Sequence, residues 1–483
     1  MKRDNKIFIE EGFFESQLLW ILIIFLEYCR KKNIKEIVFE KKYELIFKNK
    51  IIKKELEGFK VIFLDDQLPF YLKNKICLYL TLLPKSFLLT LFFKKEKIIQ
   101  KKWYDYQLYH SILDTALSLS KDGVITPKYW IILKSIYLNL KKIEIAKFLL
   151  KQNISTVVSS HNVYFVKSFN SIFRERNIPV YCQSDSNLYR QPKKKDESWN
   201  ILHNRKLRKK LLKNISYSVA HEYWVRKFLG KGDYFDSNLA YKKKIFDNGV
   251  KNVVMLHVFR DSPYLALDKT RIFINYIDWI DHTIKIISKS KEKWFFKIHP
   301  NSKNWGENPK VLLYKLIKNN KAKNITISDN GNLKLMKNLQ KVVTYSGSAS
   351  YEAISLGIKP VIISNNSICH YDKSTILKPK NLKDYEKILL SRNYQKFKTS
   401  KEQIKLAKKF IYINEKVMPL TKDLNTLPIY RSEKKKKELD YIMVNKSLKK
   451  NLLFLKKLGY YISKGLSHTL SRKGLDLLNK DLR

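Results

Sequence analysis

Strand-like and helix-like segments alternate along this 483-residue chain, and their order constrains its fold more than any other feature. Near the start, "KIFIEEG" has the pattern of a strand followed by a loop, residues 15–32 have the single apolar face of a helix, and "KEIVFE" and "FKVIFLDD" read as further strands. Successive strand, helix and strand segments pair in parallel through right-handed crossovers. The sequence therefore predicts a Rossmann-like N-terminal half.

A second series of strands and helices begins at "NVVMLHVFRDSPY" and ends at "KVVTYSGSASYEAISLGIKPVIIS". The chain is too long for one ordinary core, so we expect an α/β fold of two Rossmann-like domains that face a central cleft. The expected divisions are residues 1–189, an N-terminal acceptor domain; 190–247, a basic inter-domain segment; 248–385, a C-terminal nucleotide-donor domain; 386–430, helices that cross back to the N-terminal domain; and 431–483, a basic amphipathic helical tail.

The formal net charge of +52 allows three explanations. It can reflect the composition of an AT-rich coding sequence. It can also serve to bind an anionic membrane surface or acidic substrate, or to bind nucleic acid. Only 14 of the 96 basic residues are arginines, whereas proteins that recognise bases rely on arginine for bidentate contacts. Nucleic acid is therefore the least favoured partner.

Two segments bear on membranes and location. The apolar stretch 76–93 is nearly long enough to span a bilayer, but Pro84 divides it, which predicts two short helical halves in the core or in an interfacial hairpin. Residues 431–483 carry 15 basic and 5 acidic side chains, with leucines at helical spacing from Leu448 to Leu455. This amphipathic helix either docks on an anionic membrane or packs on the protein as a solvated tail.

The cysteines and the N-terminus indicate the cellular compartment. The four cysteines have no metal-ligand or disulfide spacing, and the first residues lack the pattern of a secretory signal. We therefore expect a cytoplasmic protein, with a peripheral position on the inner face of the cytoplasmic membrane if the tail docks there.

The richest chemistry lies after the predicted strand 341–344. Ser346, Gly347 and Ser348 form a small, hydroxyl-rich turn at the start of a helix, where backbone N–H groups and the helix dipole favour a phosphate. A simple helix cap is the alternative interpretation. Glu352 falls in the first helical turn, where it either supports the cap or accepts hydrogen bonds from a ribose.

A His-Pro pair follows the predicted strand 294–298. Pro300 ends this strand and restricts the backbone of His299, which should lie at the carboxyl end of a parallel strand, where open α/β sheets bind ligands. A histidine fixed beside a phosphate can donate a hydrogen bond and stabilise charge on a departing nucleotide. A structural role is the usual one for a lone histidine, and the downstream phosphate-type turn makes the functional role more favourable.

Three motifs in order, "HVFRDSP", "FKIHPNS" and "YSGSASYEAISLGIKPV", resemble the C-terminal half of bacterial capsule polysaccharide biosynthesis proteins. These are GT-B glycosyltransferases similar to the Kdo transferases, and more distantly to polysialyltransferases and CDP-glycerol glycerophosphotransferases. The resemblance covers roughly residues 253–363. It implies a cytidine-nucleotide donor, often CMP-Kdo, bound by the residues that match the family's donor-site motifs: His299, Pro300, Ser346, Gly347, Ser348 and Glu352.

The chain departs from these families in two respects. The acidic catalytic-base motif of the Kdo transferases has no clear match, and Gly347 separates the hydroxyl pair of the polysialyltransferases. No Asp-x-Asp sequence occurs, so we expect metal-independent transfer in which His299 and basic residues such as Lys297 meet the leaving-group charge. The catalytic base is then sought among residues at strand ends, and Asp261 and His161 rank ahead of Glu10 and Glu11.

Together these features predict an enzyme that needs no cofactor beyond its donor substrate. The leading function is transfer of a sugar, Kdo or another acidic sugar, from a nucleotide donor to a surface or capsular polysaccharide. The acceptor would be a glycan or a lipid-linked glycan. Two alternatives remain: a glycerophosphotransferase that uses a CDP-activated donor, and a non-enzymatic basic protein that binds RNA or membrane.

Overall fold

The computed structural model divides into two compact units. The first comprises Met1–Ile112, Tyr129–Ile201 and Val417–Arg483, and the second Leu113–Lys128 and Leu202–Lys416. The structure describes residues 5–12, 15–41, 47–91, 106–120, 128–161, 163–184, 187–191, 205–231, 251–260, 272–273, 276–328, 339–345, 347–363, 373–420, 436–467 and 469–479. Two of the predicted site residues, Asp261 and Ser346, lie outside these ranges.

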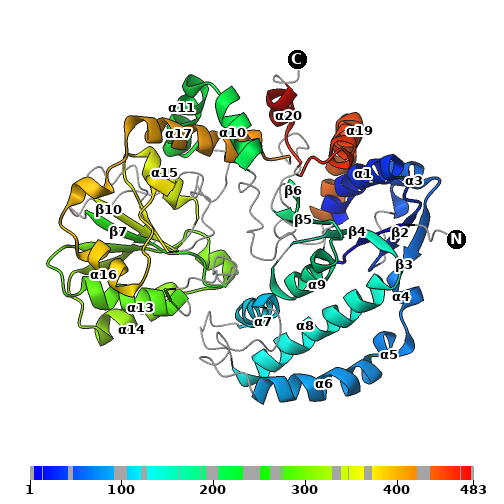
Figure 1. Ribbon diagram of the computed structural model, residues 1–483, viewed down its shortest axis with the longest axis horizontal. Helices are drawn as coiled ribbons and strands as arrows, with labels where there is room; N and C mark the ends of the chain where they lie inside the picture. Colours follow the sequence, from blue (N-terminus) through cyan, green and yellow to red (C-terminus); the bar gives the residue numbers. More distant parts are fainter. Residues whose placement is uncertain are drawn as a thin grey trace. The chain divides into compact units, whose positions relative to one another are not determined.

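The first unit contains a six-stranded sheet of order β3-β2-β1-β4-β5-β6, in which β6 pairs antiparallel with β5 and the other pairs are parallel (Figure 1). Its strands are β1 Lys6–Ile9, β2 Glu36–Phe39, β3 Lys60–Phe63, β4 Ile154–Ser159, β5 Val180–Ser184 and β6 Asn187–Arg190. Its helices are α1 Glu15–Lys32, α3 Lys50–Leu56, α4 Leu64–Gln67, α5 Phe70–Lys73, α6 Lys75–Leu91, α8 Tyr129–Leu150, α9 Tyr164–Glu175, α19 Lys436–Ser463 and α20 Arg472–Asn479. Helix α7, Tyr106–Leu119, contains the boundary between the units.

The second unit contains a five-stranded sheet of order β11-β10-β7-β8-β9 with parallel pairing throughout. Its strands are β7 Asn252–Met255, β8 Trp294–Lys297, β9 Ile325–Ser328, β10 Lys341–Thr344 and β11 Val361–Ile362. Its α-helices are α10 Arg205–Asn214, α11 Tyr217–Arg226, α13 Tyr276–Ile287, α14 Pro309–Asn319, α15 Ala349–Ser355, α16 Leu382–Leu390 and α17 Lys401–Tyr412. Shorter helical segments are η2 Lys227–Lys231, η4 Ser302–Trp305, η7 Lys373–Thr375, η8 Tyr394–Phe397 and η9 Ile413–Val417, the last of which ends at the unit boundary.

Both sheets share one arrangement of strands. Counted from the first strand of each unit, the five leading strands have the Rossmann order 3-2-1-4-5. The strand order therefore reverses between β1 and β4 in the first unit, and between β7 and β10 in the second. Ligands of open α/β sheets bind at such switch points, outside the carboxyl ends of the strands. The predicted α/β class with two Rossmann-like domains is confirmed.

Continuous apolar runs explain why these strands form the cores. Phe8, Val38 and Val157 of the first sheet are fully buried among helices α8 and α9, and Val254, Phe296 and other residues of the second are buried against α13. Strands covered on both faces read as uninterrupted apolar runs, which is the pattern that the sequence shows.

Helix α6 corrects one prediction. The sequence predicted two halves broken at Pro84, but α6 is a single helix with this proline inside it. Proline removes the hydrogen bond to the carbonyl four residues earlier, that of Leu80, and Leu80 lies at an exposed position where water can replace the lost donor. The helix therefore continues through the proline.

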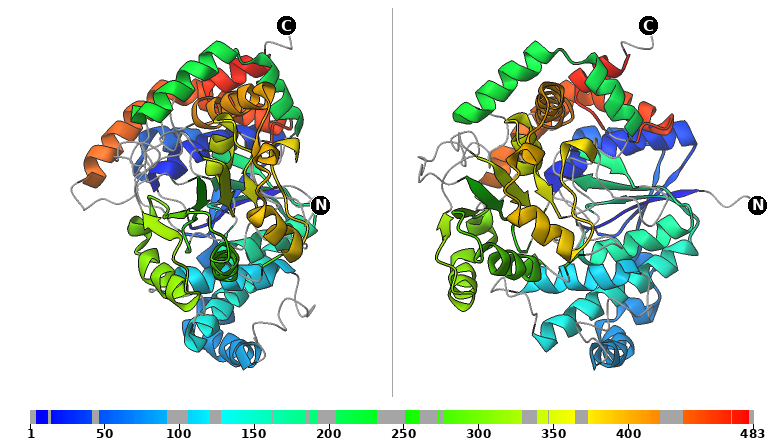
Figure 2. Two further views of the ribbon diagram at one scale, coloured as in Figure 1. Left: turned by 90° about the vertical axis from the view of Figure 1, so that its left-hand side faces the viewer. Right: turned by 60° about the vertical axis from the view of Figure 1, so that its left-hand side comes forward.

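The predicted tail helix is confirmed as α19. It packs along α1 in the first unit, as Figures 1 and 2 show. Leu448 and Leu455 are buried, and a Cβ on Gly459 would lie 2.2 Å from the carbonyl oxygen of Ile24, so the two helices approach closely. The tail helix is thus packed on the body of the first unit through α1.

Helix α17 belongs to the segment predicted to cross back to the N-terminal domain, and it packs within the second unit. Helix α17 lies against α11 and α15 within the second unit, where Phe410 contacts Tyr351 and Tyr412 contacts Tyr223. The chain enters the first unit again from Val417. Among the described residues, no helix is both long enough and apolar enough to cross a bilayer.

Candidate functional site

Two histidines lie together at the switch point of the second unit. Strands β10, β7 and β8 are neighbours in register, with Met255 paired to Lys297. His257 and His299 each follow their strand by two residues, and their ring centroids are 5.8 Å apart. A Cβ on Gly347, which follows β10, would lie 4.0 Å from Cδ2 of His257. Three strand ends therefore bring His257, His299 and Gly347 to one edge of the sheet.

The hydrogen bond at Nδ1 fixes the tautomer of His299. The backbone N–H of Asn301 donates to Nδ1 at 3.2 Å, so the proton of the neutral ring resides on Nε2. Burial, with His257 and Lys297 nearby, lowers the pKa of His299 to about 3. Nε2 has no hydrogen-bond partner among the residues that the structure describes. At neutral pH, His299 is therefore an uncharged donor whose Nε2–H meets no acceptor within the described ranges.

His257 carries its proton on the other ring nitrogen, Nδ1. Its Nδ1 lies 3.0 Å from the carbonyl oxygen of Val258, which can only accept, so this nitrogen carries the proton. In the neutral ring, Nε2 then presents a lone pair. The backbone N–H of His257 donates to the hydroxyl of Tyr276. The edge thus offers one imidazole donor and one imidazole acceptor side by side.

A buried carboxylate holds the loop that follows β7. Glu307 accepts from the backbone N–H groups of Phe259 at 3.1 Å and Arg260 at 2.6 Å. Burial raises the pKa of Glu307, although these two N–H groups oppose the rise. The loop after β8 therefore fixes the loop after β7, and with it the position of His257.

The remaining donor-site predictions fall around this edge. Lys297 is buried within β8, and half-buried Pro300 follows His299. Gly347 has φ of +108°, a conformation that favours glycine. Ser348 is the exposed N-cap of α15, but its side chain makes no capping hydrogen bond. The turn therefore offers an exposed hydroxyl that does not cap the helix, next to a glycine.

Glu352 belongs to a buried group of ion-paired side chains. Its carboxylate lies 3.2 Å from Nζ of Lys227, which also binds Glu415 at 2.6 Å. All three side chains are buried, and although burial opposes it, the two carboxylates raise the pKa of Lys227. The structure gives Glu352 a role in joining α15 to η2 and η9, and a ribose contact stays a prediction.

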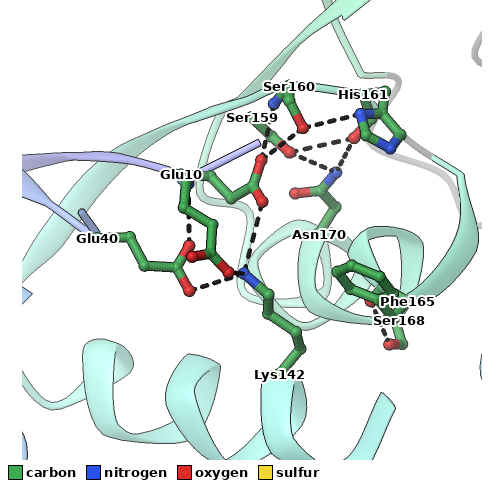
Figure 3. A network of polar contacts seen from close by, with 10 residues as sticks. Glu10, Glu40, Lys142, Ser159, Ser160, His161, Phe165, Ser168 and Asn170 are labelled. Atoms are coloured by element: carbon green, nitrogen blue, oxygen red, sulfur yellow. Dashed lines mark hydrogen bonds and ion pairs between the residues drawn. The ribbon is translucent and has the colours of Figure 1, made fainter. Parts of the chain in front are cut away.

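A second polar cluster lies at the switch point of the first unit (Figure 3). Glu10, directly after β1, accepts from the backbone N–H of Ser160 at 3.0 Å and from its hydroxyl at 2.6 Å. The Ser160 hydroxyl also lies 2.8 Å from Nδ1 of His161. Since the hydroxyl donates its one proton to the carboxylate, His161 donates from Nδ1 to Ser160. Nε2 of neutral His161 is therefore an acceptor.

Packing fixes the main chain around His161. The amide of Asn170 in α9 donates to the carbonyl oxygen of His161 at 3.0 Å. A Cβ on Gly12 would lie 2.3 Å from Oγ of Ser160, so only glycine fits beside the serine. Burial lowers the pKa of His161, although Glu10 opposes this. The ring is consequently uncharged at neutral pH and held in one tautomer.

Lys142 of α8 forms ion pairs with three carboxylates beside this chain of hydrogen bonds. Its Nζ lies 2.7 Å from Glu40, 3.1 Å from Glu11 and 3.5 Å from Glu10. Burial and the carboxylates of Glu10 and Glu11, which outweigh Lys142, raise the pKa of Glu40 to about 7. The pKa of Glu10 is lowered: burial opposes this, but Lys142, His161 and Ser160 stabilise the anion. Glu10 is therefore the charged anchor of the network.

Sequence reasoning did not single out His257, Glu40 or Lys142. His257 occupies the same position after its strand as His299, and Glu40 directly follows β2 as Glu10 directly follows β1. Lys142 falls on the buried face of α8, in line with Asn139 and Ala146. A lysine on an apolar helical face predicts a buried acid, and this signal could have located the cluster. The described residues contain no group of three or more His, Cys, Asp or Glu side chains suited to a metal.

Comparisons with known proteins give structural similarity without a sequence family. No protein-family model matches the chain, and no curated protein matches its sequence. It is similar to a UDP-GlcNAc 2-epimerase from Methanocaldococcus jannaschii (16% identity, 85% of this chain, 99% of that chain, TM-score 0.27) and to Anabaena HepE in complex with UDP-glucose (10%, 93%, 99%, 0.29). A glycosyltransferase from Rickettsia africae is also similar (13%, 94%, 98%, 0.25). At these identities and TM-scores, the similarity carries no conclusion about function.

Proposed function

We propose that this protein is a GT-B-type glycosyltransferase that moves a sugar from a nucleotide donor to a glycan acceptor. In the finer form of the proposal, the donor is a cytidine nucleotide that carries Kdo or another acidic sugar. The acceptor is a surface or capsular polysaccharide, and the transfer is independent of metal. The family resemblance of the motifs around His257, His299 and Gly347 supports this choice of donor and acceptor.

The observation that carries the proposal is the Nε2–H of His299 at a topological switch point, for which the described part of the chain contains no acceptor. A neutral donor in a partly buried site can stabilise charge as it develops on a departing phosphate, without first losing a strong bond to the protein. Gly347 lets the backbone approach the same position, and Ser348 offers a further hydroxyl. Lys297 contributes positive charge from the end of β8, the strand that His299 follows. These residues would hold the phosphate of the donor.

The first unit supplies a suitable base. Nε2 of His161 accepts the proton of the acceptor hydroxyl, the acceptor oxygen bonds to the anomeric carbon, and the bond from that carbon to the nucleotide phosphate breaks. The resulting imidazolium is stabilised through Ser160 by the anionic Glu10, whose hydrogen-bond chain holds the ring in position. Asp261 is the second candidate for this base.

A donor screen tests the function. The full chain is incubated with CMP-Kdo, CMP-sialic acid, UDP-sugars and CDP-glycerol together with capsular oligosaccharide acceptors, and products are detected by mass spectrometry. Release of CMP with a matching gain in acceptor mass supports the proposal. Turnover of CDP-glycerol instead would assign the chain to glycerophosphotransfer, since the same edge can hold that phosphate.

Binding controls separate the enzyme from a simple basic protein. A nucleotide that stabilises the folded state raises its unfolding temperature, so we expect CMP or CDP to do so. RNA binding with a steep salt dependence and no response to any nucleotide would contradict the transferase function.

A further inference from the structure

Helix α6 presents most of its large apolar side chains to the solvent, whereas half of its buried face consists of hydroxyl side chains. The buried face carries Leu78, Leu82, Ser86 and Thr90, at intervals of four residues. Ser86 and Thr90 satisfy their hydroxyls on carbonyls of the same helix, those of Leu82 and Ser86. A helix at a water-facing surface ordinarily has the reverse pattern, with its polar residues outward.

The outward face is strongly apolar. Ile76 and Leu80 are 70% and 72% exposed, and the stripe continues along the helix. Its other large members, together with one from the preceding α5, are Phe70, Phe87, Leu88 and Leu91. A continuous exposed apolar stripe of this kind marks an interaction surface, whereas single exposed apolar residues need no explanation.

Aromatic side chains extend this surface onto the start of α8. Tyr129 and Trp130 are both exposed, and the ring of Tyr129 lies 6.4 Å from that of Phe87 in an edge-on contact. Tyrosine and tryptophan are enriched where protein meets the headgroup region of a bilayer, because each ring has an apolar body and a polar group.

The charged side chains of α5 and α6 have one sign. Lys73, Lys75 and Lys85 are exposed on α5 and α6, and residues 70–91 contain no aspartate or glutamate. Lysines at the border of an apolar face can extend their ammonium groups to anionic phospholipid headgroups while their methylene chains stay in contact with the apolar face. A protein partner with an acidic rim would also suit the lysines, but it would not account for the tyrosine and tryptophan at one end.

The helix has the length for lying in a bilayer surface. Its 17 residues correspond to about 25 Å of helix, which is short of a membrane span. It packs on α8 through Leu78 and Leu82, and α8 lies between it and the sheet in Figure 1. The helix is thus fixed at the outer edge of the first unit with its apolar stripe facing outward.

We propose that α5, α6 and the first turn of α8 form a docking surface for a bilayer that contains anionic phospholipid. The helix lies parallel to the bilayer, with its apolar stripe among the acyl chains near the headgroups and its lysines against the phosphates. This assigns membrane contact to α6 in place of the C-terminal tail, whose leucines pack on α1.

Co-sedimentation of the full chain with vesicles tests this assignment. The vesicles contain equal parts of phosphatidylcholine and phosphatidylglycerol, or phosphatidylcholine alone. The double variant Leu80→Gln, Phe87→Gln changes two exposed side chains, so its unfolding temperature should match that of the wild type. Because both side chains leave the bilayer on substitution, we expect its affinity for the mixed vesicles to fall by at least about tenfold.

Leu453→Gln is the matched control. Leu453 is an exposed leucine of α19 in the same unit, 83% exposed, and lies outside the proposed surface. Its substitution should leave vesicle binding unchanged. The charge variant Lys75→Glu, Lys85→Glu should weaken binding to the mixed vesicles and remove the difference between the two vesicle types.

Three outcomes would overturn the proposal. Unchanged binding of the α6 double variant would do so, as would a loss of binding in Leu453→Gln, which would assign the contact to the tail. In the third outcome, the wild type binds no vesicles and is a dimer, and the α6 substitutions convert it into a monomer. This result would identify a second copy of the chain as the occupant of the surface. Vesicle binding is measured without donor or acceptor, so its failure leaves the proposed transfer reaction unaffected.

Discussion

The two switch points of this protein have the same topology and opposite chemistry. Between β1 and β4, the first unit concentrates buried charge, with Glu10, Glu40 and Lys142 in direct contact. Between β7 and β10, the second unit has two imidazoles beside a glycine of positive φ. The first arrangement satisfies its charged groups within the protein, whereas the second leaves the Nε2–H of His299 without a partner among the described residues.

The same strand order holds two histidines whose Nε2 atoms have opposite hydrogen-bonding character. Glu10 and Ser160 hold His161 with its acceptor nitrogen at Nε2, which suits removal of a proton. Asn301 holds His299 with its donor at Nε2, which suits contact with an anion. The identity of the neighbour at Nδ1, and not the strand topology, decides whether Nε2 accepts or donates a hydrogen bond.

The largest expected effect concerns the buried charge of the first unit. Lys142→Met leaves the buried carboxylates without their cation, so the free energy of unfolding should fall by about 3–5 kcal/mol. Chemical denaturation measures this change. Lys147→Met on the same helix removes an exposed ion pair with Glu144 and should cost no more than about 1 kcal/mol. Equal losses in the two variants would contradict a special role for Lys142.

The next largest effect is the loss of turnover on substitution of His299 in the second unit. His299→Ala removes the proposed donor to the leaving phosphate, so kcat should fall by about 10²–10³-fold while the fold is kept. Steady-state kinetics with the donor identified by the screen measures this. His282→Ala removes a histidine of α13 that pairs with Glu386 at the surface and should leave kcat unchanged. Near-normal turnover in His299→Ala would refute the assigned role.

Removal of the Ser160 hydroxyl, which connects Glu10 to His161, should have a smaller effect on turnover. Ser160→Ala removes the hydroxyl that fixes the tautomer, so kcat should fall by about 10- to 100-fold with KM nearly constant, less than a general base itself contributes. The pH dependence of kcat should also shift, because the imidazolium loses its connection to the carboxylate. Ser171→Ala, which removes a hydroxyl bonded within α9, is the control. A change in KM alone would argue against a positioning role.

The smallest effect is a pH dependence of stability. The folded-state pKa of Glu40 is raised from 4.5 to about 7, so folded Glu40 binds a proton where the unfolded chain does not. Its stabilising contribution is present below the unfolded pKa and is lost as the pH rises through about 7. Between pH 6 and 8, wild type should lose about 1 kcal/mol relative to Glu40→Gln, measured by denaturation at each pH. Parallel pH profiles for the two proteins would contradict this.

The strands and many helices were predictable because each has a local signal. Residues 15–32 and 341–344 form the predicted helix and strand, since one apolar face and one buried run suffice to specify them. The break at Pro84 was wrong because propensity rules do not register that the affected carbonyl lies at an exposed position.

The candidate sites were only partly predictable. His161 and His299 follow strands, and that position is visible in the sequence. Lys142 comes from a helix more than 130 residues after Glu10, and the pairing of His257 with His299 depends on the register of β7 against β8. Partners, tautomers and buried pairs arise from tertiary contacts, and these contacts change the expected environment of Glu352.

Calorimetric titration with CMP, compared between wild type, His299→Ala and His161→Ala, tests the division of roles most directly. If the second unit holds the donor phosphate and the first supplies the base, His299→Ala should weaken CMP binding by about tenfold or more, the loss of a hydrogen bond to a charged group. His161→Ala should bind CMP as the wild type does, and yet lose turnover. Equal weakening in both variants, or normal CMP affinity in His299→Ala, would contradict the account.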